Sequence, residues 1–149
     1  MRVIISRIVK GKIKVNRDII SSVGEGLVVF AGFQKADREE VLKKMVDKII
    51  NLRIFQDSKS KFNYSLKDKK GAVLCVPNFT LSAVTAKGRR PSFEDSLPFD
   101  SAKNMFTEFV ELFRKERFEV KKGVFGERMD IELEMEGPVN IILDSRDLK

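Results

Sequence analysis

The first part of the chain alternates apolar and polar residues, as strands with one buried face do. The alternation predicts strands over residues 3–9 and 12–19, joined by a turn at Lys10-Gly11. Residues 26–33 follow as a short, wholly apolar run. Such a run is typical of a buried strand.

Two later segments carry apolar residues at helical spacing. Residues 38–51 form the first, with Asp37 as the expected N-cap, and residues 98–115 form the second, with an aromatic-rich apolar stripe. Between them, residues 56–71 are polar and lysine-rich and predict a loop. Residues 71–76 are apolar again and predict another buried strand.

The last third of the chain returns to strand patterns. Residues 118–122 and 130–136 predict strands, Gly137-Pro138 interrupts the second of them, and residues 139–143 resume it. Alternation places four carboxylates on one face of the 130–136 strand, those of Asp130, Glu132, Glu134 and Glu136. We interpret them as a solvated sheet face rather than a cation site, because no loop supplies converging ligands. The elements together indicate one α+β domain over residues 1–149, with too many strands for a helical bundle.

Composition narrows the class of protein. The 149 residues are 42% hydrophobic and 34% charged, as expected for one domain with a hydrophobic core. No apolar run approaches the roughly 18 residues that span a membrane, and the N-terminus does not resemble a signal peptide. Cys75 is the single cysteine, which excludes an internal disulfide and favours the cytoplasm. Its apolar neighbours predict a buried side chain rather than a nucleophile.

The net charge of +7 indicates a polyanionic partner such as a nucleic acid. The cations gather in three clusters, within residues 1–17, 59–70 and 87–90. Charge alone leaves a second interpretation open, a lysine-rich solvated surface. No zinc-finger, RRM or KH motif is present to decide between them.

The chain has no histidine. This excludes Ser-His and Cys-His nucleophile pairs and histidine-bound zinc. Catalysis would have to use hydroxyls, carboxylates, cations, backbone amides or groups of the substrate. One candidate is the turn after the 71–76 strand, Pro77-Asn78-Phe79-Thr80-Leu81, whose free NH groups could form an oxyanion hole. From the residues alone, an ordinary turn is the simpler interpretation.

Three segments, in this order and at these distances, resemble the D-aminoacyl-tRNA deacylase family. They are residues 77–81, the Lys-Gly-Arg-Arg-Pro-Ser-Phe stretch at 87–93 and Gly-Pro-Val-Asn at 137–140. Further matches, including residues 51–55 and 143–145, extend the resemblance over almost the whole chain. The chain departs from the family pattern at Pro77, Asn78 and Asn140, where serine, glutamine and threonine are usual.

The resemblance implies an esterase that hydrolyses the bond between a D-amino acid and its tRNA, and Gly-tRNA mischarged on tRNA-Ala as well. It implies mixed β-sheets curled into a barrel-like core with two main helices. The residues it makes catalytic are Thr80, Phe79 and Asn78, with backbone NH groups near Phe79 and Thr80 as oxyanion donors. The 2′-hydroxyl of the terminal adenosine would assist, and neither metal nor cofactor is needed. An older view of the family makes the threonine a nucleophile, but nothing in this sequence is placed to deprotonate Thr80.

The resemblance further implies a homodimer with active sites at the subunit interface. A cis Gly137-Pro138 peptide of one subunit would enter the partner's site and exclude L-amino acids, held by hydrogen bonds from Arg7 to its carbonyls. The other residues that it implies for substrate binding are Phe125, Met129 and Asn140. Those that it implies for tRNA binding are Lys87, Arg89 and Arg90.

Two other functions remain open from the sequence. A paralogous branch acts on tRNA mischarged with L-alanine and has proline at the position of Pro77, but it lacks an equivalent of Arg7. A non-catalytic tRNA-binding relative would retain the fold without the activity. Arg7 and the intact 87–93 segment favour the D-specific branch.

Overall fold

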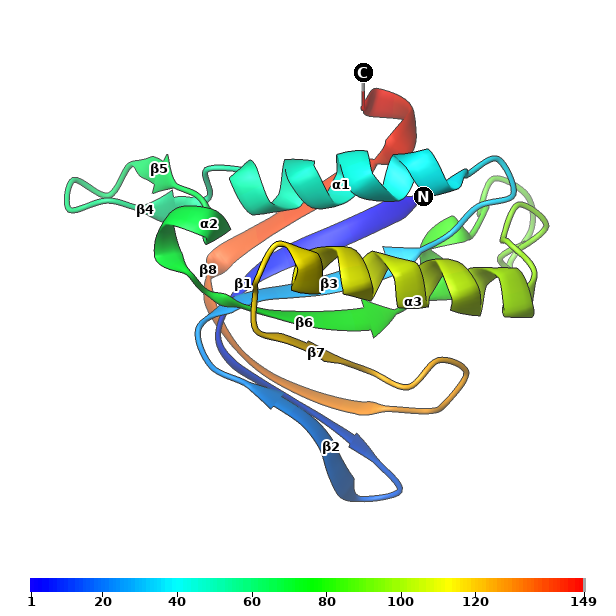
Figure 1. The fold of residues 1–149 in the computed structure, drawn as a ribbon. Coiled ribbons are helices and arrows are strands. Elements are labelled where there is room, and N and C mark those ends of the chain that lie inside the picture. The colour runs from blue at the N-terminus through cyan, green and yellow to red at the C-terminus, as the bar shows by residue number, and fades with distance from the viewer. Residues whose placement is uncertain (149) are drawn as a thin grey trace.

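The computed structural model describes residues 1–148. The strands are β1 (Arg2–Val15), β2 (Asp18–Val23), β3 (Gly26–Gly32), β4 (Phe55–Gln56), β5 (Phe62–Tyr64), β6 (Ala72–Pro77), β7 (Val120–Lys122) and β8 (Asp130–Asp144). The helices are α1 (Glu39–Asn51), α2 (Leu66–Lys69) and α3 (Phe99–Lys115), with short 3-10 helices η1 (Phe79–Ser82) and η2 (Ser145–Asp147). Figure 1 shows α1 and α3 side by side over one face of a strongly curved sheet.

The sheet is mixed and centres on β1. This strand pairs antiparallel with β2 and β3 along one edge and with β8 along the other. From β3 the sheet continues through β6 and β7 in parallel pairing, which gives the order β2-β1-β3-β6-β7 with β8 added at β1. The curling brings the far end of β1, β2 and β8 beneath β3 and β6 (Figure 1). The expected α+β class with a curled mixed sheet is therefore confirmed.

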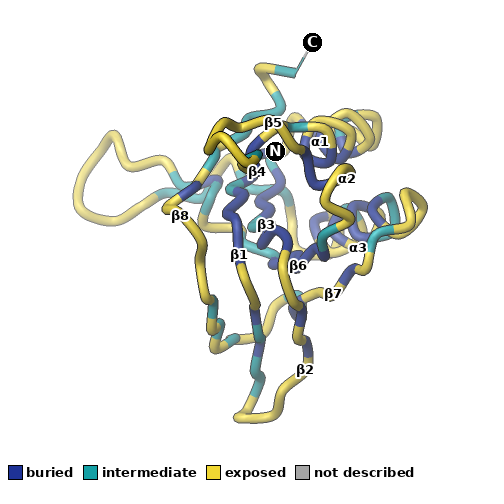
Figure 2. Tube along the Cα trace, turned by 90° about the vertical axis from the view of Figure 1, so that its left-hand side faces the viewer, coloured by how far each residue is buried: buried dark blue, intermediate teal, exposed yellow. Residues whose placement is uncertain are grey.

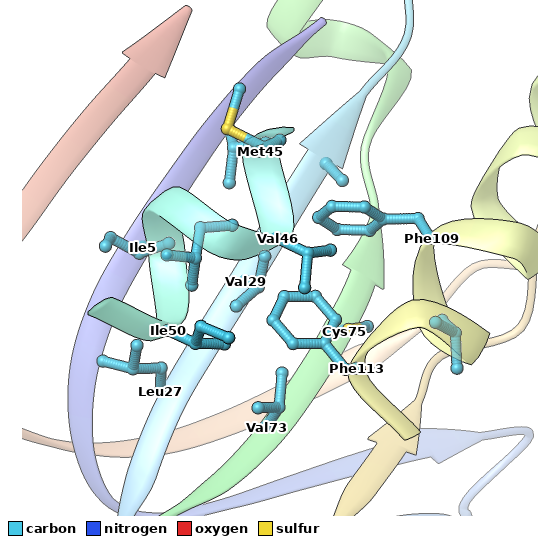
Figure 3. Close-up of a cluster of buried hydrophobic side chains, with 14 of the residues drawn as sticks. Ile5, Leu27, Val29, Met45, Val46, Ile50, Val73, Cys75, Phe109 and Phe113 are labelled. Atoms are coloured by element: carbon cyan, nitrogen blue, oxygen red, sulfur yellow. The ribbon is translucent and has the colours of Figure 1, made fainter. Parts of the chain in front are cut away.

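Both faces of β3 and β6 are covered, which explains their apolar sequences. Side chains alternate between faces along a strand. Val29 and Cys75 therefore point to the helices, whereas Val28 and Leu74 belong to a second core on the opposite face. Figure 3 shows the first core, in which side chains of α1 and α3 meet those of β1, β3 and β6. The second core is closed by the curling strands β1, β2 and β8.

The predicted turn at Lys10-Gly11 is wrong. β1 runs unbroken through Gly11, and the reversal comes at Asn16 and Arg17, whose φ angles are +50° and +74°. Gly11 is needed for a close approach instead, because a Cβ there would lie 2.8 Å from the Leu74 side chain. Figure 2 shows the part of β1 near the N-terminus as buried and the tip of the β1–β2 hairpin as exposed.

Two predictions between β3 and β6 also need correction. Asp37 does not cap α1, which begins after Arg38 with no side-chain cap. Its carboxylate instead accepts hydrogen bonds from the Gln34 amide at 2.6 Å and from the α-amino group of Met1. The segment 56–71 is not a plain loop. It holds the β4–β5 hairpin and the one-turn helix α2, which a capping box between Ser65 and Asp68 starts.

The predicted break at Gly137-Pro138 is confirmed in the pairing of the last strand with β1. β8 spans residues 130–144, but its pairing with β1 goes from Met135, opposite Ile8, to Asn140, opposite Ser6, so residues 136–139 have no partner on β1. The carboxylates of its first half lie opposite lysines of β1. Glu134 pairs with Lys10 at 2.7 Å, and Glu132 pairs with Lys12 at 3.0 Å. The acidic strand face therefore balances the N-terminal basic cluster.

None of the helices within residues 1–148 is both long enough and apolar enough to cross a membrane.

Phe109 tests the packing between α3 and the sheet. Its side chain is fully buried and lies edge-on to the rings of Phe33 and Phe113, at centroid distances of 6.3 and 5.1 Å. Truncation leaves a cavity, so Phe109→Ala should lower the free energy of unfolding by about 3–5 kcal/mol. Phe109→Leu, which keeps most of the volume, should lose clearly less. Urea denaturation measures both, and equal stability of the alanine variant and the unsubstituted protein would contradict this packing.

Candidate active site

A cleft of about 470 Å³ opens where β6 ends. Its walls come from the turn into η1, the start of α3 and the loop before β8. Four of the sequence-predicted residues line it, namely Asn78, Phe79, Phe125 and Met129. A second hollow, of about 570 Å³, lies at the first turns of α1 and α3, but its carboxylates at Glu39, Glu40 and Glu108 would repel RNA.

The turn at the rim of the cleft is fixed by the central sheet. The amide of Asn78 donates to the carbonyl of Ala31 at 2.8 Å, which extends the β3–β6 pairing by one step. The Asn78 carbonyl lies so close to Gly32 that a Cβ there would approach it to 2.6 Å. Arg2 adds a hydrogen bond to the Leu81 carbonyl at 3.2 Å. The turn into η1 is therefore held by contacts with β1 and β3 and by its direct connection to β6.

The first two amides of η1 are free. The 3-10 hydrogen bonds begin with the amide of Leu81, which donates to Asn78 at 3.3 Å, and continue with Ala83, which donates to Thr80 at 3.1 Å. The amides of Phe79 and Thr80 precede these bonds, as the first NH groups of any helix do. No hydrogen-bond acceptor for either is found among residues 1–148. Two neighbouring NH groups thus stand unpaired at the rim of an apolar cleft.

The side chains beside these amides carry no base. The Thr80 hydroxyl donates to the side-chain oxygen of Asn78. An amide oxygen accepts this hydrogen bond but does not take up a proton at neutral pH. Phe79 is 60% exposed, with its ring 5.1 Å from that of Phe93. This arrangement orients the Thr80 hydroxyl without activating it as a nucleophile.

The apolar wall of the cleft is built around Phe125. Its ring lies 5.1 Å from that of Phe99 and 6.0 Å from that of Phe106, both on α3. Gly126, with φ of +85°, lets Phe99 approach, since a Cβ there would lie 2.8 Å from the ring. This wall offers an amino-acid side chain an aromatic surface, and Glu127 beside it is the one charged residue among residues 1–148 in the lining of the cleft.

Ser96 is a lining residue that the sequence reasoning missed. Its hydroxyl oxygen is shielded from solvent and has no hydrogen-bond partner among residues 1–148. A single serine in a polar loop gives no signal in the sequence, because only the fold brings it to the cleft.

The loop that carries Lys87, Arg89 and Arg90 leaves directly from the η1 side of the cleft. A bridge between Val84 and Ser92, with amide–carbonyl distances of 2.9 Å both ways, closes it. All three cations are exposed. Because the returning chain brings Phe93 against Phe79, the basic loop lies beside the free amides.

The remaining predicted residues lie elsewhere, on β1 and β8. The Gly137-Pro138 peptide is cis, and both residues are exposed. Arg7 faces this part of β8 with only 4% of its side chain exposed. Asn140 accepts a hydrogen bond from the Ser6 hydroxyl at 2.5 Å. These residues form a second group, which we call the gate group (Arg7, Gly137, Pro138 and Asn140).

The contacts of Arg7 differ from those that the resemblance implies. Its guanidinium donates to the Ile54 carbonyl at 3.0 Å and lies 5.9 Å from the centre of the Phe62 ring. Its Nε lies 3.3 Å from the carboxylate of Glu136, an ion pair without hydrogen-bond alignment. Hydrogen bonds to the carbonyls of Gly137 and Pro138 are not found within residues 1–148. Arg7 therefore contacts Glu136, the residue before Gly137, through charge. It does not hold the Gly137-Pro138 peptide itself.

The strand registers show how far apart the two groups are. Arg7 lies in one row with Leu27 and Val73, whereas Pro77 lies in the row of Ala31, four residues further along. Four residues of strand span about 13 Å, and the three strand spacings from β8 to β6 add about 14 Å across the sheet. Within one chain, the gate group is remote from the cleft.

Cys75 takes no part in either group. Its side chain is fully buried between β6 and the helices, and burial raises the pKa of its thiol. The predicted role as a small buried hydrophobe is confirmed.

A family model and relatives found by sequence name the same kind of enzyme. A family model described as D-Tyr-tRNA(Tyr) deacylase matches residues 4–144. A D-aminoacyl-tRNA deacylase of Aquifex aeolicus is 45% identical over 99% of this chain and 100% of its own. One from Dictyoglomus turgidum is 42% identical over 100% of this chain and 96% of its own.

Two solved structures share the fold. One, named c-Myc DNA Unwinding Element Binding Protein, superposes with a TM-score of 0.90 at 34% identity, over 97% of this chain and 98% of its own. The other, a probable eukaryotic D-amino acid tRNA deacylase, gives 0.83 at 21% identity, over 95% of this chain and 97% of its own. At that identity the second supports the fold alone.

Proposed function

The chain belongs to the D-Tyr-tRNA(Tyr) deacylase family, and from that membership we propose that it is a hydrolase that cleaves the ester bond of D-aminoacyl-tRNA. The products are the free D-amino acid and tRNA, so the reaction proofreads chirality in translation. We extend the proposal to Gly-tRNA mischarged on tRNA-Ala, because glycine has no side chain by which a chiral site could reject it. The reaction would take place in the cytoplasm, where charged tRNA is used.

The observation that carries the mechanism is the pair of free amides at Phe79 and Thr80. When water adds to the ester carbonyl, negative charge develops on the carbonyl oxygen, and these two NH groups are suited to receive it. The carbon–oxygen bond to the ribose then breaks, and the ribose oxygen takes up a proton. The neighbouring 2′-hydroxyl of the substrate relays that proton, so the histidine-free chain needs no general base of its own.

We further propose that each active site is shared between two subunits. The wide separation of the gate group from the cleft along the sheet supports this arrangement. So does the surface around the gate, where Gly137 and Pro138 are exposed on the strand edge that β1 does not occupy and Ile142 is 72% exposed. In a homodimer, Gly137 and Pro138 of one subunit would enter the cleft of the other and reject L-substrates by contact at the alpha carbon.

The basic loop with Lys87, Arg89 and Arg90 would hold the phosphates of the acceptor end beside the cleft. A second candidate function is nucleic-acid binding without catalysis, because one similar structure carries the name of a DNA-binding protein. A third outcome, activity on L-alanine carried by the wrong tRNA, belongs to the paralogous branch. One set of substrates distinguishes all three.

Incubation of the protein with D-Tyr-tRNA, L-Tyr-tRNA and Gly-tRNA tests the proposed function directly. We expect release of D-tyrosine and glycine, unchanged by EDTA, with L-Tyr-tRNA left intact. Measurement of the acid-precipitable aminoacyl-tRNA that remains follows each reaction. Binding of tRNA without hydrolysis of any ester would favour the non-catalytic candidate, and hydrolysis of L-Ala-tRNA alone would favour the paralogous activity.

Substitution of Thr80 separates the hydroxyl from the backbone amides. Thr80→Ala removes the hydroxyl but leaves both NH groups, so kcat should fall by less than the roughly 100-fold that loss of an oxyanion donor costs. Thr80→Ser, which keeps the hydroxyl, is the matched control and should lie close to the unsubstituted protein. A covalent aminoacyl-Thr80 species in mass spectrometry would overturn the substrate-assisted mechanism.

Arg7 should affect selectivity rather than chemistry. Arg7→Ala removes the charge beside Glu136 and the hydrogen bond to Ile54, which should loosen the gate and raise hydrolysis of L-Tyr-tRNA relative to D-Tyr-tRNA. Arg7→Lys keeps the charge and should shift the ratio less. A thermal unfolding curve for each variant checks the fold. An unchanged D/L ratio with both rates lowered equally would make Arg7 merely structural.

A further inference from the structure

The basic cluster of residues 53–70 has no part in the site described so far. This segment, the β4–β5 hairpin with α2, carries six cations against the two carboxylates of Asp57 and Asp68. The cations are Arg53, Lys59, Lys61, Lys67, Lys69 and Lys70, and all of them are exposed. Figure 1 shows the hairpin at the opposite end of the molecule from the loop that follows η1.

Both carboxylates of the segment are engaged by the backbone or by neutral side chains. Asp57 accepts hydrogen bonds from the amides of Lys59 at 2.8 Å and Lys61 at 3.0 Å, within the hairpin turn. Asp68 closes the capping box of α2 with Ser65. No ion pair to the six cations is found among residues 1–148, in contrast to the lysines of β1, which face Glu132 and Glu134. The positive charge of the hairpin is therefore locally uncompensated.

Two exposed aromatic rings stand among these cations. Phe62 is 49% exposed and Tyr64 is 44% exposed, two residues apart on β5 and therefore on the same side of that strand. The Lys69 ammonium lies 6.0 Å from the centre of the Tyr64 ring. Unpaired lysines interleaved with exposed aromatic rings are the surface on which single-stranded nucleic acids bind, with phosphates on the cations and bases stacked on the rings.

We propose that the β4–β5 hairpin is a second RNA-contacting surface, which binds the phosphates and an unstacked base near the single-stranded end of the tRNA. The hairpin is coupled to the gate group, because Arg7 contacts both the Ile54 carbonyl and the Phe62 ring. In a shared site, the hairpin would therefore accompany the gate to the partner's cleft and meet the same acceptor end as the partner's basic loop. This part of the proposal rests on the proposed function.

The test measures binding of deacylated tRNA over a range of salt concentrations. In Lys59→Gln/Lys61→Gln, only side-chain charges are lost, because the turn uses the backbone amides of these residues. The slope of log K against log salt should become shallower by about 1.4, the value for two contacts with single-stranded phosphates. The control Lys43→Gln/Lys44→Gln removes the same charge from exposed positions on α1 and should leave the slope unchanged.

Tyr64→Leu tests the stacking separately. It should weaken tRNA binding severalfold with the salt slope unchanged, because stacking releases no counterions. If Lys59→Gln/Lys61→Gln and Lys43→Gln/Lys44→Gln change the salt slope equally, the effect comes from the net charge of the protein and not from the hairpin. That result would overturn the proposal. Loss of binding to phosphatidylserine vesicles, with the tRNA slope unaffected, would assign the hairpin to a membrane surface instead and overturn it too.

The probe carries no ester, so the outcome is independent of the proposed function. A shallower slope in a protein that hydrolyses nothing would uphold the hairpin surface and reject the deacylase activity. Normal hydrolysis of D-Tyr-tRNA with identical slopes in all variants would uphold the deacylase activity and reject the hairpin surface.

Discussion

The pairing of β1 along both of its edges is the constraint on which the rest of the structure depends. One edge of this strand holds β2 and β3, and the other holds β8, so the first and last strands of the chain are adjacent. Because β3 is fixed in this way, β6 pairs with it in parallel and ends at Pro77, opposite Ala31. The turn that exposes the amides of Phe79 and Thr80 is thus set by the register of the sheet.

The same strand carries the gate group away from the cleft. Arg7 projects from the middle of β1, where the register of β8 shifts around Gly137 and Pro138. The fold therefore gives one chain both an apolar cleft with free amides and, at a distance from it, the exposed Gly137-Pro138 peptide. A second copy of the chain is the simplest means of combining them, and the same step would bring the β4–β5 hairpin to the substrate.

Much of this fold could be predicted from the alternation of residues. Strong signals, such as the wholly apolar strands and the stripes of α1 and α3, gave the right elements. The errors arose where tertiary contacts outweigh local preference. Gly11 resembles a turn residue, but it lies within a strand and allows the Leu74 side chain to approach closely. Asp37 resembles a helix cap, but its carboxylate accepts a hydrogen bond from the α-amino group of Met1. Ser96 and the actual partners of Arg7 gave no local signal, because residues distant in the sequence supply their surroundings.

A mixing experiment tests the shared site most directly. Phe79→Pro removes one of the two free amides and should be nearly inactive, yet its gate group is intact. Arg7→Ala has an intact cleft and a loosened gate. The Arg7→Ala protein is equilibrated with an excess of the Phe79→Pro protein. If subunits share sites, each intact cleft of an Arg7→Ala subunit then receives the intact gate of a Phe79→Pro subunit. Hydrolysis of L-Tyr-tRNA should therefore fall, whereas hydrolysis of D-Tyr-tRNA should stay the same. L-Tyr-tRNA hydrolysis that stays constant at every mixing ratio, in subunits shown to exchange, would contradict the shared site.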